Sequence, residues 1–418
     1  MAYICNRLWF FLILSVLNNV HGELNIYGTT DNGWDFVRDI FKENFIEERD
    51  LGGSVAIYHQ GKLVVDLWAG SFDQSQGKAY DNNTLQLVFS TSKGVVAVAA
   101  ALCVQQGLLN YSALVTEYWP EYRQGGKGNT TVADILSHRA GLPFEFASDE
   151  QRLNWTVIVD MLQQQSPIWP PGTKHGYHAL TYGWLAGELV RRVDKRKRSI
   201  GQFIRDEIAS KLDIEFYIGL PSTEEYRVSP LNVKPNGNET VDTSAFAWFN
   251  EQRTHEAEIP AANGITNARS VARLYASLIG DIENNKYKRL LNEEILKEAT
   301  KSNTPPGEID SVFNVTSVLA MGFFLLDRTL PSLGPGVFGH SGAGGSIGFA
   351  APAKQLSFAY VMNRLELNAS TEVDPRYKHM LDRIAAKINN NGASLAKKLS
   401  VHLLLFCIVI FFIKFIIV

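Results

Sequence analysis

Apolar and polar positions divide this 418-residue chain into strands near its two ends and helices between them. The apolar spacing from Trp34 to Ile46 predicts an amphipathic helix. Residues 54–68 alternate as a β-hairpin that turns at Gln60-Gly61. Helical patterns and loops fill the long middle section, short strands return from about residue 337, and residues 376–389 predict a closing helix.

This order of elements predicts an α/β (α+β) fold that contains one domain discontinuous along the chain. An antiparallel sheet flanked by helices would use residues of about 23–90 and 260–390. A mainly helical domain of about 105–255 would be inserted between these two parts. The folded region as a whole would then span residues 23–390.

The two ends of the chain are typical of targeting segments. Residues 1–22 combine Arg7, an apolar stretch and small residues at a cleavage position, as a secretory signal peptide does. Residues 401–418 are apolar and follow a short spacer at 391–400. A single-pass span would place lysines on the lumenal side, so a glycolipid-anchor signal fits this tail better. Either form would attach an exported protein to the extracellular face of the cell surface.

Composition agrees with an exported globular protein. The net charge of −3 gives no reason to expect a nucleic-acid partner. Cys103 is the single cysteine between the terminal segments, so it has no partner for an intrachain disulfide and is expected to be buried and inert. Seven asparagines head glycosylation motifs, and we expect some of them to be buried or unused. They are Asn82, Asn110, Asn129, Asn154, Asn238, Asn314 and Asn368.

Candidate chemistry begins at Ser90-Thr-Ser-Lys93, which precedes an apolar helical run. Residues three apart on a helix share a face, so the hydroxyl and the amine can meet. A serine becomes a nucleophile near neutral pH only when a neighbouring base takes its proton. A lysine that starts a buried helix can be that base, because desolvation favours its uncharged form. An isolated match would be explained more simply by a helix cap followed by a solvated lysine.

Two further motifs follow in the order that such an enzyme needs. Tyr177-His178-Ala179 precedes a helical pattern, and residues 338–345 form a short strand that ends in glycines. With the S-x-x-K motif, they resemble the serine β-lactamase and penicillin-binding-protein superfamily, most of all class C β-lactamases and the esterases related to them. Residues 136–143 and 264–273 are also similar to recurrent family segments, and the resemblance covers roughly residues 30–390.

The resemblance implies a role for each matching position and places the active site in a groove between the two parts of the fold. Ser90 would be the acylated nucleophile, Lys93 its base or charge partner, and Tyr177 a proton relay to the leaving group. The N–H groups of Ser90 and Ala343 would form the oxyanion hole. The strand that binds substrate would contribute His340, Ser341, Gly342 and Ala343. No cofactor and no metal ion are implied.

Two positions depart from the family pattern. Ala179 replaces the asparagine of Tyr-x-Asn, and His340 replaces the cationic lysine of Lys-Thr-Gly. With an unperturbed pKa of ~6.5, His340 would be only partly charged. Both changes weaken recognition of an anionic β-lactam or peptide, so the predicted activity is that of an esterase or amidase on a small-molecule ester or amide. The alternative is a catalytically inert surface binding protein that keeps the fold.

Other candidate sites have simpler explanations. The G-x-S-x-G motif around Ser346 would be a nucleophile elbow only in a strand-turn-helix, and two strands are predicted after it. His175 and His178 have metal-ligand spacing but no nearby acidic ligand, and His178 is expected to line the groove or cover Tyr177. His138 is expected to be a structural hydrogen-bonding residue. Three aromatic residues could form a substrate wall or pack on the core: Phe246, Trp248 and Phe249.

Overall fold

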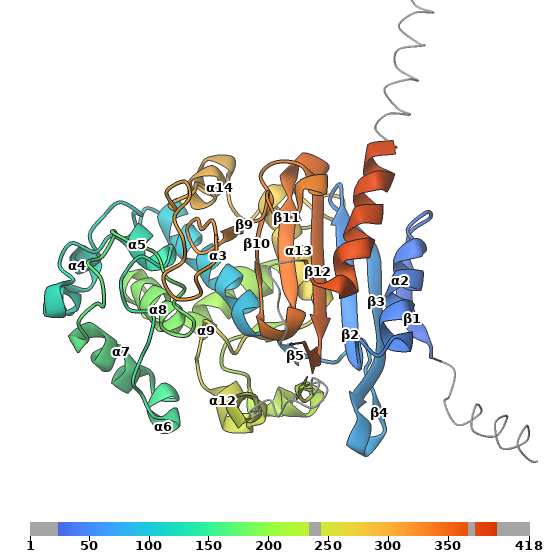
Figure 1. Ribbon diagram of the computed structural model, residues 1–418, viewed down its shortest axis with the longest axis horizontal. Helices are drawn as coiled ribbons and strands as arrows, with labels where there is room; N and C mark the ends of the chain where they lie inside the picture. The colour runs from blue at the N-terminus through green and yellow to red at the C-terminus, as the bar shows by residue number, and fades with distance from the viewer. Residues whose placement is uncertain (1–23, 234–243, 367–372, 391–418) are drawn as a thin grey trace, which may run out of the picture.

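An antiparallel sheet assembled from both ends of the chain forms one half of the molecule (Figure 1). The computed structural model describes residues 24–233, 244–366 and 373–390. The predicted signal peptide, spacer and tail lie outside these ranges. The strand order is β1 (Ile26–Thr30), β3 (Lys62–Asp73), β2 (Gly52–His59), β12 (Leu356–Met362), β11 (Ile347–Ala351), β10 (Phe338–Ser341) and β9 (Phe324–Leu325), with β4 (Lys78–Ala79) beside β3.

The middle of this sheet joins the two ends of the chain. Strands β2 and β12 pair in antiparallel register from His59 opposite Leu356 to Gly53 opposite Met362. Both strands are buried almost throughout, because helices cover both faces of the sheet, and they therefore carry nearly continuous apolar runs. Edge strand β1 instead alternates between half-buried and exposed residues.

Helices from distant parts of the sequence cover the two faces. Helix α2 (Phe36–Ile46) and the helix over residues 375–390 pack on one face, and α13 (Ala268–Ile279) packs on the other. Helix α13 approaches closely at Gly348, where a Cβ atom would overlap Val271 Cγ1. Only glycine fits this contact without moving the helix.

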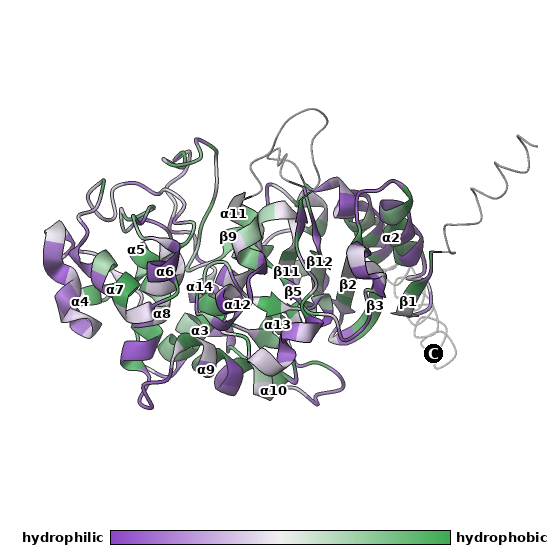
Figure 2. Ribbon diagram, turned by 90° about the horizontal axis from the view of Figure 1, so that it is seen from below, coloured by the Kyte–Doolittle hydropathy of each residue, from purple (hydrophilic) through white to green (hydrophobic). Residues whose placement is uncertain are grey.

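The other half of the molecule is mainly helical and lies on the left of Figure 1. Helix α3 lies between this half and the sheet, and it is buried on nearly all sides from Ser92 to Cys103. Apolar residues of α3 and α13 are green in Figure 2. The helices other than those that cover the sheet are α3 (Ser92–Gln105), α4 (Val115–Tyr118), α5 (Val132–Leu136), α6 (Asp149–Arg152), α7 (Trp155–Gln164), α8 (Thr181–Val193), α9 (Ile200–Ile204), α10 (Ser210–Leu212), α11 (Ser244–Ala247), α12 (Gln252–Glu256) and α14 (Glu293–Ala299).

The described residues form two further small sheets. Strands β5 (Gln86–Leu87), β8 (Ile265–Thr266) and β6 (Phe216–Tyr217) form one of them. Strands β13 (Arg364–Leu365) and β7 (Asn232–Val233) form the other. Within the described ranges, no helix combines the length and the apolar character that a membrane crossing requires.

The predicted fold class is confirmed, and several local predictions hold. The first helix runs from Phe36 rather than Trp34, and the hairpin turns at Gln60 and Gly61, both with positive φ, as a two-residue turn requires. Cys103 is buried, and burial raises the pKa of its thiol to about 12, so it is inert as expected.

Candidate active site

Ser90 lies in a single 3-10 turn, Phe89–Thr91, that leads into α3. Phe89 has a φ of +44°, which is unfavourable for a residue with a side chain and costs about 1–3 kcal/mol. Its ring makes edge contacts with the rings of Phe249 and Phe246, with ring centres 5.0 Å and 5.8 Å away, and these contacts hold it in this conformation. The turn leaves Ser90 partly exposed while Thr91 is buried.

A glycine from the middle of the chain supports the turn from behind. The Val88 N–H donates to the Gly264 carbonyl at 2.9 Å, and the Gly264 N–H donates to Ser92 Oγ at 2.8 Å. A Cβ atom at Gly264 would overlap the same Ser92 hydroxyl. The segment 264–273, which resembles a family segment, therefore begins at a residue that fixes the Ser90 turn.

The Lys93 amine lies within hydrogen-bond distance of three oxygen atoms. Its Nζ is 3.0 Å from Ser90 Oγ, 2.7 Å from the Ala179 carbonyl and 3.0 Å from the Ala261 carbonyl. A carbonyl can only accept a hydrogen bond, so two N–H bonds of the amine are directed at the two carbonyls. The third direction faces the serine hydroxyl.

The charge state of Lys93 follows from its surroundings. Its side chain is inaccessible to solvent, and this burial lowers the pKa of the ammonium well below its ordinary value near 10.5. A neutral amine has two N–H donors and one lone pair. With both donors used by carbonyls, the lone pair is directed at Ser90 Oγ and can accept its proton.

Tyr177 completes the group around the serine. Burial raises the pKa of its phenol above the ordinary value near 10, and the neighbouring Ser90 side chain acts in the opposite direction. The Lys93 Nζ lies 4.8 Å from the centre of the tyrosine ring. The Tyr177 N–H donates to Asp310 Oδ2 at 2.9 Å, which fixes the backbone. The structure thus brings together Ser90, Lys93 and Tyr177, and a protonated phenol can donate to a leaving oxygen.

His138 positions the tyrosine ring. It stacks between Tyr177 at 4.7 Å and Tyr182 at 5.0 Å, and its Nδ1 accepts a hydrogen bond from the His178 N–H at 2.9 Å. Burial holds the pKa of this imidazole well below its usual range, so the ring is neutral. His138 is therefore structural, as predicted. Asp310, which also holds Tyr177, lies in no recognisable motif, so its role could not be predicted from the sequence.

The glycine-rich turn after β10 lies against the Ser90 turn. A Cβ atom at Gly342 would overlap the Val88 carbonyl oxygen, and Thr91 Oγ1 donates to the Ser346 carbonyl at 3.2 Å. The Ser90 and Ala343 N–H groups lie in the first turns of two 3-10 helices, Phe89–Thr91 and Ala343–Gly345, where intrahelical acceptors are missing. Both are suited to hold a developing oxyanion. Ser341 and Ala343 are exposed to solvent.

Arg376 holds the same turn from the side of the closing helix. This buried guanidinium donates to the Gly344 carbonyl and to the Arg364 carbonyl at 2.9 Å, and it pairs with Asp374 at 2.6 Å. A Cβ atom at Gly345 would overlap its Nη2 atom. Sequence reasoning placed Arg376 only at the start of a helix, because its contact with the turn is long-range.

The expectation that His340 is a partly charged residue is wrong. Its side chain is fully buried, 4.6 Å from the Phe324 ring, and Nδ1 donates to the Ser341 carbonyl at 2.7 Å. Burial, with a further contribution from Lys93, lowers the pKa of His340 to about 3. A neutral imidazole therefore occupies the position in β10 at which the family pattern has a lysine.

The expectation that His178 lines a groove or covers Tyr177 is also wrong. His178 is buried, accepts a hydrogen bond from the Leu142 N–H at 3.0 Å and donates to the Gly176 carbonyl at 2.6 Å. Burial lowers the pKa of His178 to about 4. The other member of the pair, His175, binds Glu308 at 2.6 Å and Ser317 at 3.1 Å. The histidine pair thus has structural partners at both residues.

Ser346 is not in a nucleophile elbow. It precedes β11, and a 3-10 turn and strand β12 follow, as predicted. The side chain is buried, and its hydroxyl donates to Met362 Sδ at 3.3 Å. Of the three aromatic residues with two open interpretations, Trp248 and Phe249 are core members and Phe246 packs on that core. Two of them also contact the residue before Ser90.

Five predicted glycosylation sites fall within the described residues, and all five are exposed. They are Asn82, Asn110, Asn129, Asn154 and Asn314. None of these five asparagines is buried, and the expectation that some of the seven sequons are buried or unused stays a prediction. Asn238 and Asn368 lie outside the described residues.

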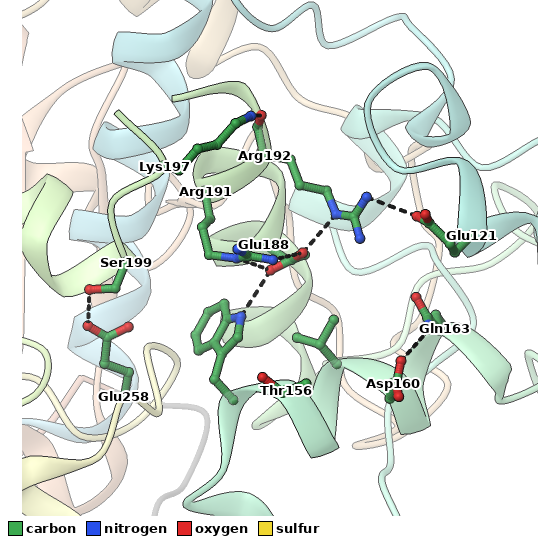
Figure 3. Close-up of a pocket in the computed structure, with 12 residues that line it drawn as sticks. Glu121, Thr156, Asp160, Gln163, Glu188, Arg191, Arg192, Lys197, Ser199 and Glu258 are labelled. Carbon is green, nitrogen blue, oxygen red and sulfur yellow. Dashed lines mark hydrogen bonds and ion pairs between the residues drawn. The ribbon is translucent and has the colours of Figure 1, made fainter. Parts of the chain in front are cut away.

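A separate pocket of about 570 Å³ lies in the helical half (Figure 3). At its centre, the buried Glu188 carboxylate accepts hydrogen bonds from Trp155 at 2.9 Å and from Arg191 and Arg192 at 2.7 Å. Ser199, which lines the same pocket, caps α9 by accepting a hydrogen bond from the Gln202 N–H. The hydrogen-bonding groups around Glu188 are paired with one another, so we interpret the residues that line this pocket as a structural ion-pair cluster.

Comparisons with known proteins agree with this geometry. The family model described as Beta-lactamase matches residues 37–382. The esterase/beta-lactamase LipL of Mycobacterium tuberculosis is 30% identical over 369 residues, which cover 81% of this chain and 83% of that protein. A family VIII carboxylesterase structure has a TM-score of 0.79 at 32% identity and covers 87% of this chain and 100% of its own. The EstA structure from Arthrobacter nitroguajacolicus Rue61a has a TM-score of 0.76 at 30% identity, with coverages of 87% and 98%.

Proposed function

Because this chain belongs to the beta-lactamase family, we propose that it hydrolyses neutral carboxylic esters through an acyl-enzyme formed on Ser90. The chain is a β-lactamase-related serine hydrolase of the carboxylesterase or amidase type. The observation that carries the finer assignment is the set of partners around the Lys93 amine. Two carbonyls and one serine hydroxyl surround it, and no carboxylate is among these partners.

In the acylation step, Ser90 Oγ attacks the ester carbonyl carbon while Lys93 Nζ accepts the hydroxyl proton. The carbonyl oxygen becomes an oxyanion held by the N–H groups of Ser90 and Ala343, each worth roughly 3 kcal/mol. The ester C–O bond then breaks, and the leaving alkoxide takes a proton from the Tyr177 phenol. The lysine ammonium, whose Nζ lies 4.8 Å from the centre of the Tyr177 ring, then returns a proton to the phenolate.

Deacylation repeats these roles with water as the nucleophile. The neutral amine of Lys93 accepts a proton from water, the hydroxyl attacks the acyl carbon, and the same N–H groups hold the oxyanion. Collapse of this intermediate breaks the bond to Ser90 Oγ, which regains a proton, and releases the carboxylic acid.

The charge of the site favours a neutral substrate. At the position of the family lysine, a buried imidazole with its pKa lowered to about 3 offers no cation to a substrate carboxylate. Ala179, which is exposed beside Tyr177, offers no amide side chain for a peptide-like group. We therefore expect a chromogenic cephalosporin to be hydrolysed more slowly than p-nitrophenyl butanoate.

Active-site labelling tests the proposal. A fluorophosphonate should add to the purified protein, and peptide mass spectrometry should find the adduct on Ser90. Ser90→Ala should abolish labelling and reduce p-nitrophenyl butanoate turnover to background. The matched control, Ser346→Ala, changes the serine of the other motif and should label and turn over like the wild type. Equal turnover by Ser90→Ala and the wild type would contradict the proposal.

We further propose that the protein is exported, glycosylated and attached to the extracellular face of the cell surface. The support is the sequence pattern of residues 1–22 and 401–418 and the exposure of the five described sequon asparagines. Treatment of intact cells with a phosphatidylinositol-specific phospholipase should release the protein. Retention in the membrane until detergent is added would identify a single-pass span instead. Recovery of the protein in a salt wash would contradict attachment to the membrane. An unchanged mass after treatment with an N-glycosidase would contradict glycosylation.

A further inference from the structure

Exposed apolar side chains concentrate beside the proposed active site. The described residues include nine large apolar side chains that are exposed, and five of these lie on three loops, one of which carries Tyr177. Their exposed fractions run from 49% for Phe144 to 80% for Phe146. Clustered exposure of this kind marks a binding surface more often than scattered exposure does. We call these residues the apolar rim: Phe144, Phe146, Ile168, Ile309 and Phe313.

The loops that carry the apolar rim meet at Gly176, directly before the tyrosine of the site. A Cβ atom at Gly176 would lie 2.6 Å from Trp169 Cη2 and 3.0 Å from Val312 Cγ2, so two of the loops approach its backbone. The third is joined to them where the Ile168 N–H donates to the Gly141 carbonyl at 2.8 Å. Loops that run beside α5 and α6 show green stretches in Figure 2.

Buried polar contacts hold these loops in place. The Glu308 carboxylate pairs with Arg139 and lies 2.6 Å from His175, and all three belong to the loops or their immediate support. Asp310 Oδ1 accepts hydrogen bonds from the N–H groups of Val312 at 2.8 Å and Phe313 at 2.9 Å. The apolar rim is thus presented by a fixed backbone, which reduces the entropic cost of binding a ligand.

One member of the apolar rim, Phe313, lies beside the tyrosine of the active site. The centre of the Phe313 ring lies 5.6 Å from that of Tyr177, and the Lys93 amine that contacts Ser90 lies 4.8 Å from the centre of the same tyrosine ring. A group attached to an ester carbonyl at Ser90 would therefore extend past Tyr177 toward Phe313. We propose that the apolar rim binds the hydrocarbon chain of a long-chain ester substrate, an inference that rests on the proposed esterase function.

The charges within these loops agree with an uncharged chain. Glu145, which lies between two rim residues in the sequence, pairs with Arg152 at 2.8 Å. Glu308, which precedes Ile309, pairs with Arg139. These two carboxylates are thus paired with arginines, and Asp310, which follows Ile309, is buried and accepts backbone hydrogen bonds. Contact with a hydrocarbon chain would remove apolar surface from water on both partners.

Chain-length selectivity tests this proposal. We would measure kcat/KM of the purified full chain for p-nitrophenyl butanoate and p-nitrophenyl octanoate. Burial of roughly half of the four added methylenes should favour octanoate about tenfold. In the double variant Phe146→Ser/Phe313→Ser, this preference should fall to about one. Both positions are exposed, so the variant should fold, and an unchanged thermal midpoint by circular dichroism would verify this.

The matched control is Ile46→Ser on α2, whose exposed fraction of 66% lies between those of Phe313 and Phe146 and which should keep the tenfold preference. A wild-type preference near one would overturn the proposal, and so would an equal loss in Ile46→Ser and the double variant. These outcomes leave the esterase function intact if butanoate turnover still requires Ser90. Turnover of both esters by Ser90→Ala would instead overturn the proposed function itself.

Discussion

The molecule contains two buried lysines whose hydrogen-bond partners differ at one position. One lysine lies in the proposed active site and the other in the helical half. Neither Lys93 nor Lys127 is accessible to solvent. The Lys127 amine donates to three backbone carbonyls, those of Gln124 at 2.8 Å, Gln163 at 3.0 Å and Gln165. The Lys93 amine has two carbonyl partners, and its third partner is Ser90 Oγ.

This difference of one partner accounts for two opposite charge states. Three carbonyls use all three hydrogens of an ammonium, so Lys127 remains a cation at neutral pH although burial lowers its pKa to about 8. Two carbonyls use both hydrogens of a neutral amine and leave its lone pair for the serine. Burial alone does not make a lysine into a base. A buried lysine can act as a base only if its third hydrogen-bond partner can give up a proton.

Replacement of the active-site lysine should produce the largest effect. Lys93→Met removes the proposed proton acceptor and should lower kcat for p-nitrophenyl butanoate about 10³-fold, within the range for loss of a general base. The kinetics of the purified variant would measure this. A fall of less than about tenfold would show that Lys93 is not the base and that the two lysines do not differ in the way proposed.

Replacement of the structural lysine should have the reverse effect. Lys127→Met leaves three buried carbonyls without their cation and should lower the free energy of unfolding by about 2–3 kcal/mol. Its kcat should stay within about twofold of the wild type, because Lys127 makes no contact with Ser90. Urea unfolding and ester kinetics on the same preparation would test both. A large loss of kcat in the folded variant would contradict this assignment.

Acid should destabilise the part of the fold around Lys93, because this part contains buried histidines. In the folded state, burial lowers the pKa of His340 to about 3 and of His178 to about 4, below the ordinary 6.5. Between these values only the unfolded chain binds the proton, so the free energy of unfolding falls as pH drops below 6.5. Each histidine should cost about 2 kcal/mol at pH 5. In His340→Gln, the loss between pH 7 and 5 should shrink by about this amount, and no change would contradict the prediction.

Sequence reasoning predicted best where short spacing determines the structure. The hairpin at Gln60-Gly61 and the strands around residues 347–362 follow from local alternation, and the three-residue spacing of S-x-x-K brings Ser90 and Lys93 together. The helix itself begins at Ser92, because the nucleophile lies in a separate 3-10 turn.

Burial by distant elements could not be predicted in the same way. His340 packs against Phe324 on a different strand, and its complete burial keeps the imidazole neutral instead of partly charged. Lys127 went unnoticed because its carbonyl partners include Gln163 and Gln165 near the end of another helix. The apolar rim was missed for the same reason, since its three loops meet only in the folded chain.

The pH dependence of Ser90 phosphonylation tests the central claim most directly. A neutral phosphonate reports on the serine and its base without a leaving-group step, so its rate should rise with pH and reach a plateau well below the ordinary lysine pKa of about 10.5. In Lys93→Met, the rate should fall about 10³-fold and the plateau should disappear, while Lys127→Met should follow the wild-type curve. A wild-type rate that increases with hydroxide concentration without a plateau, or a curve unchanged in Lys93→Met, would contradict the account.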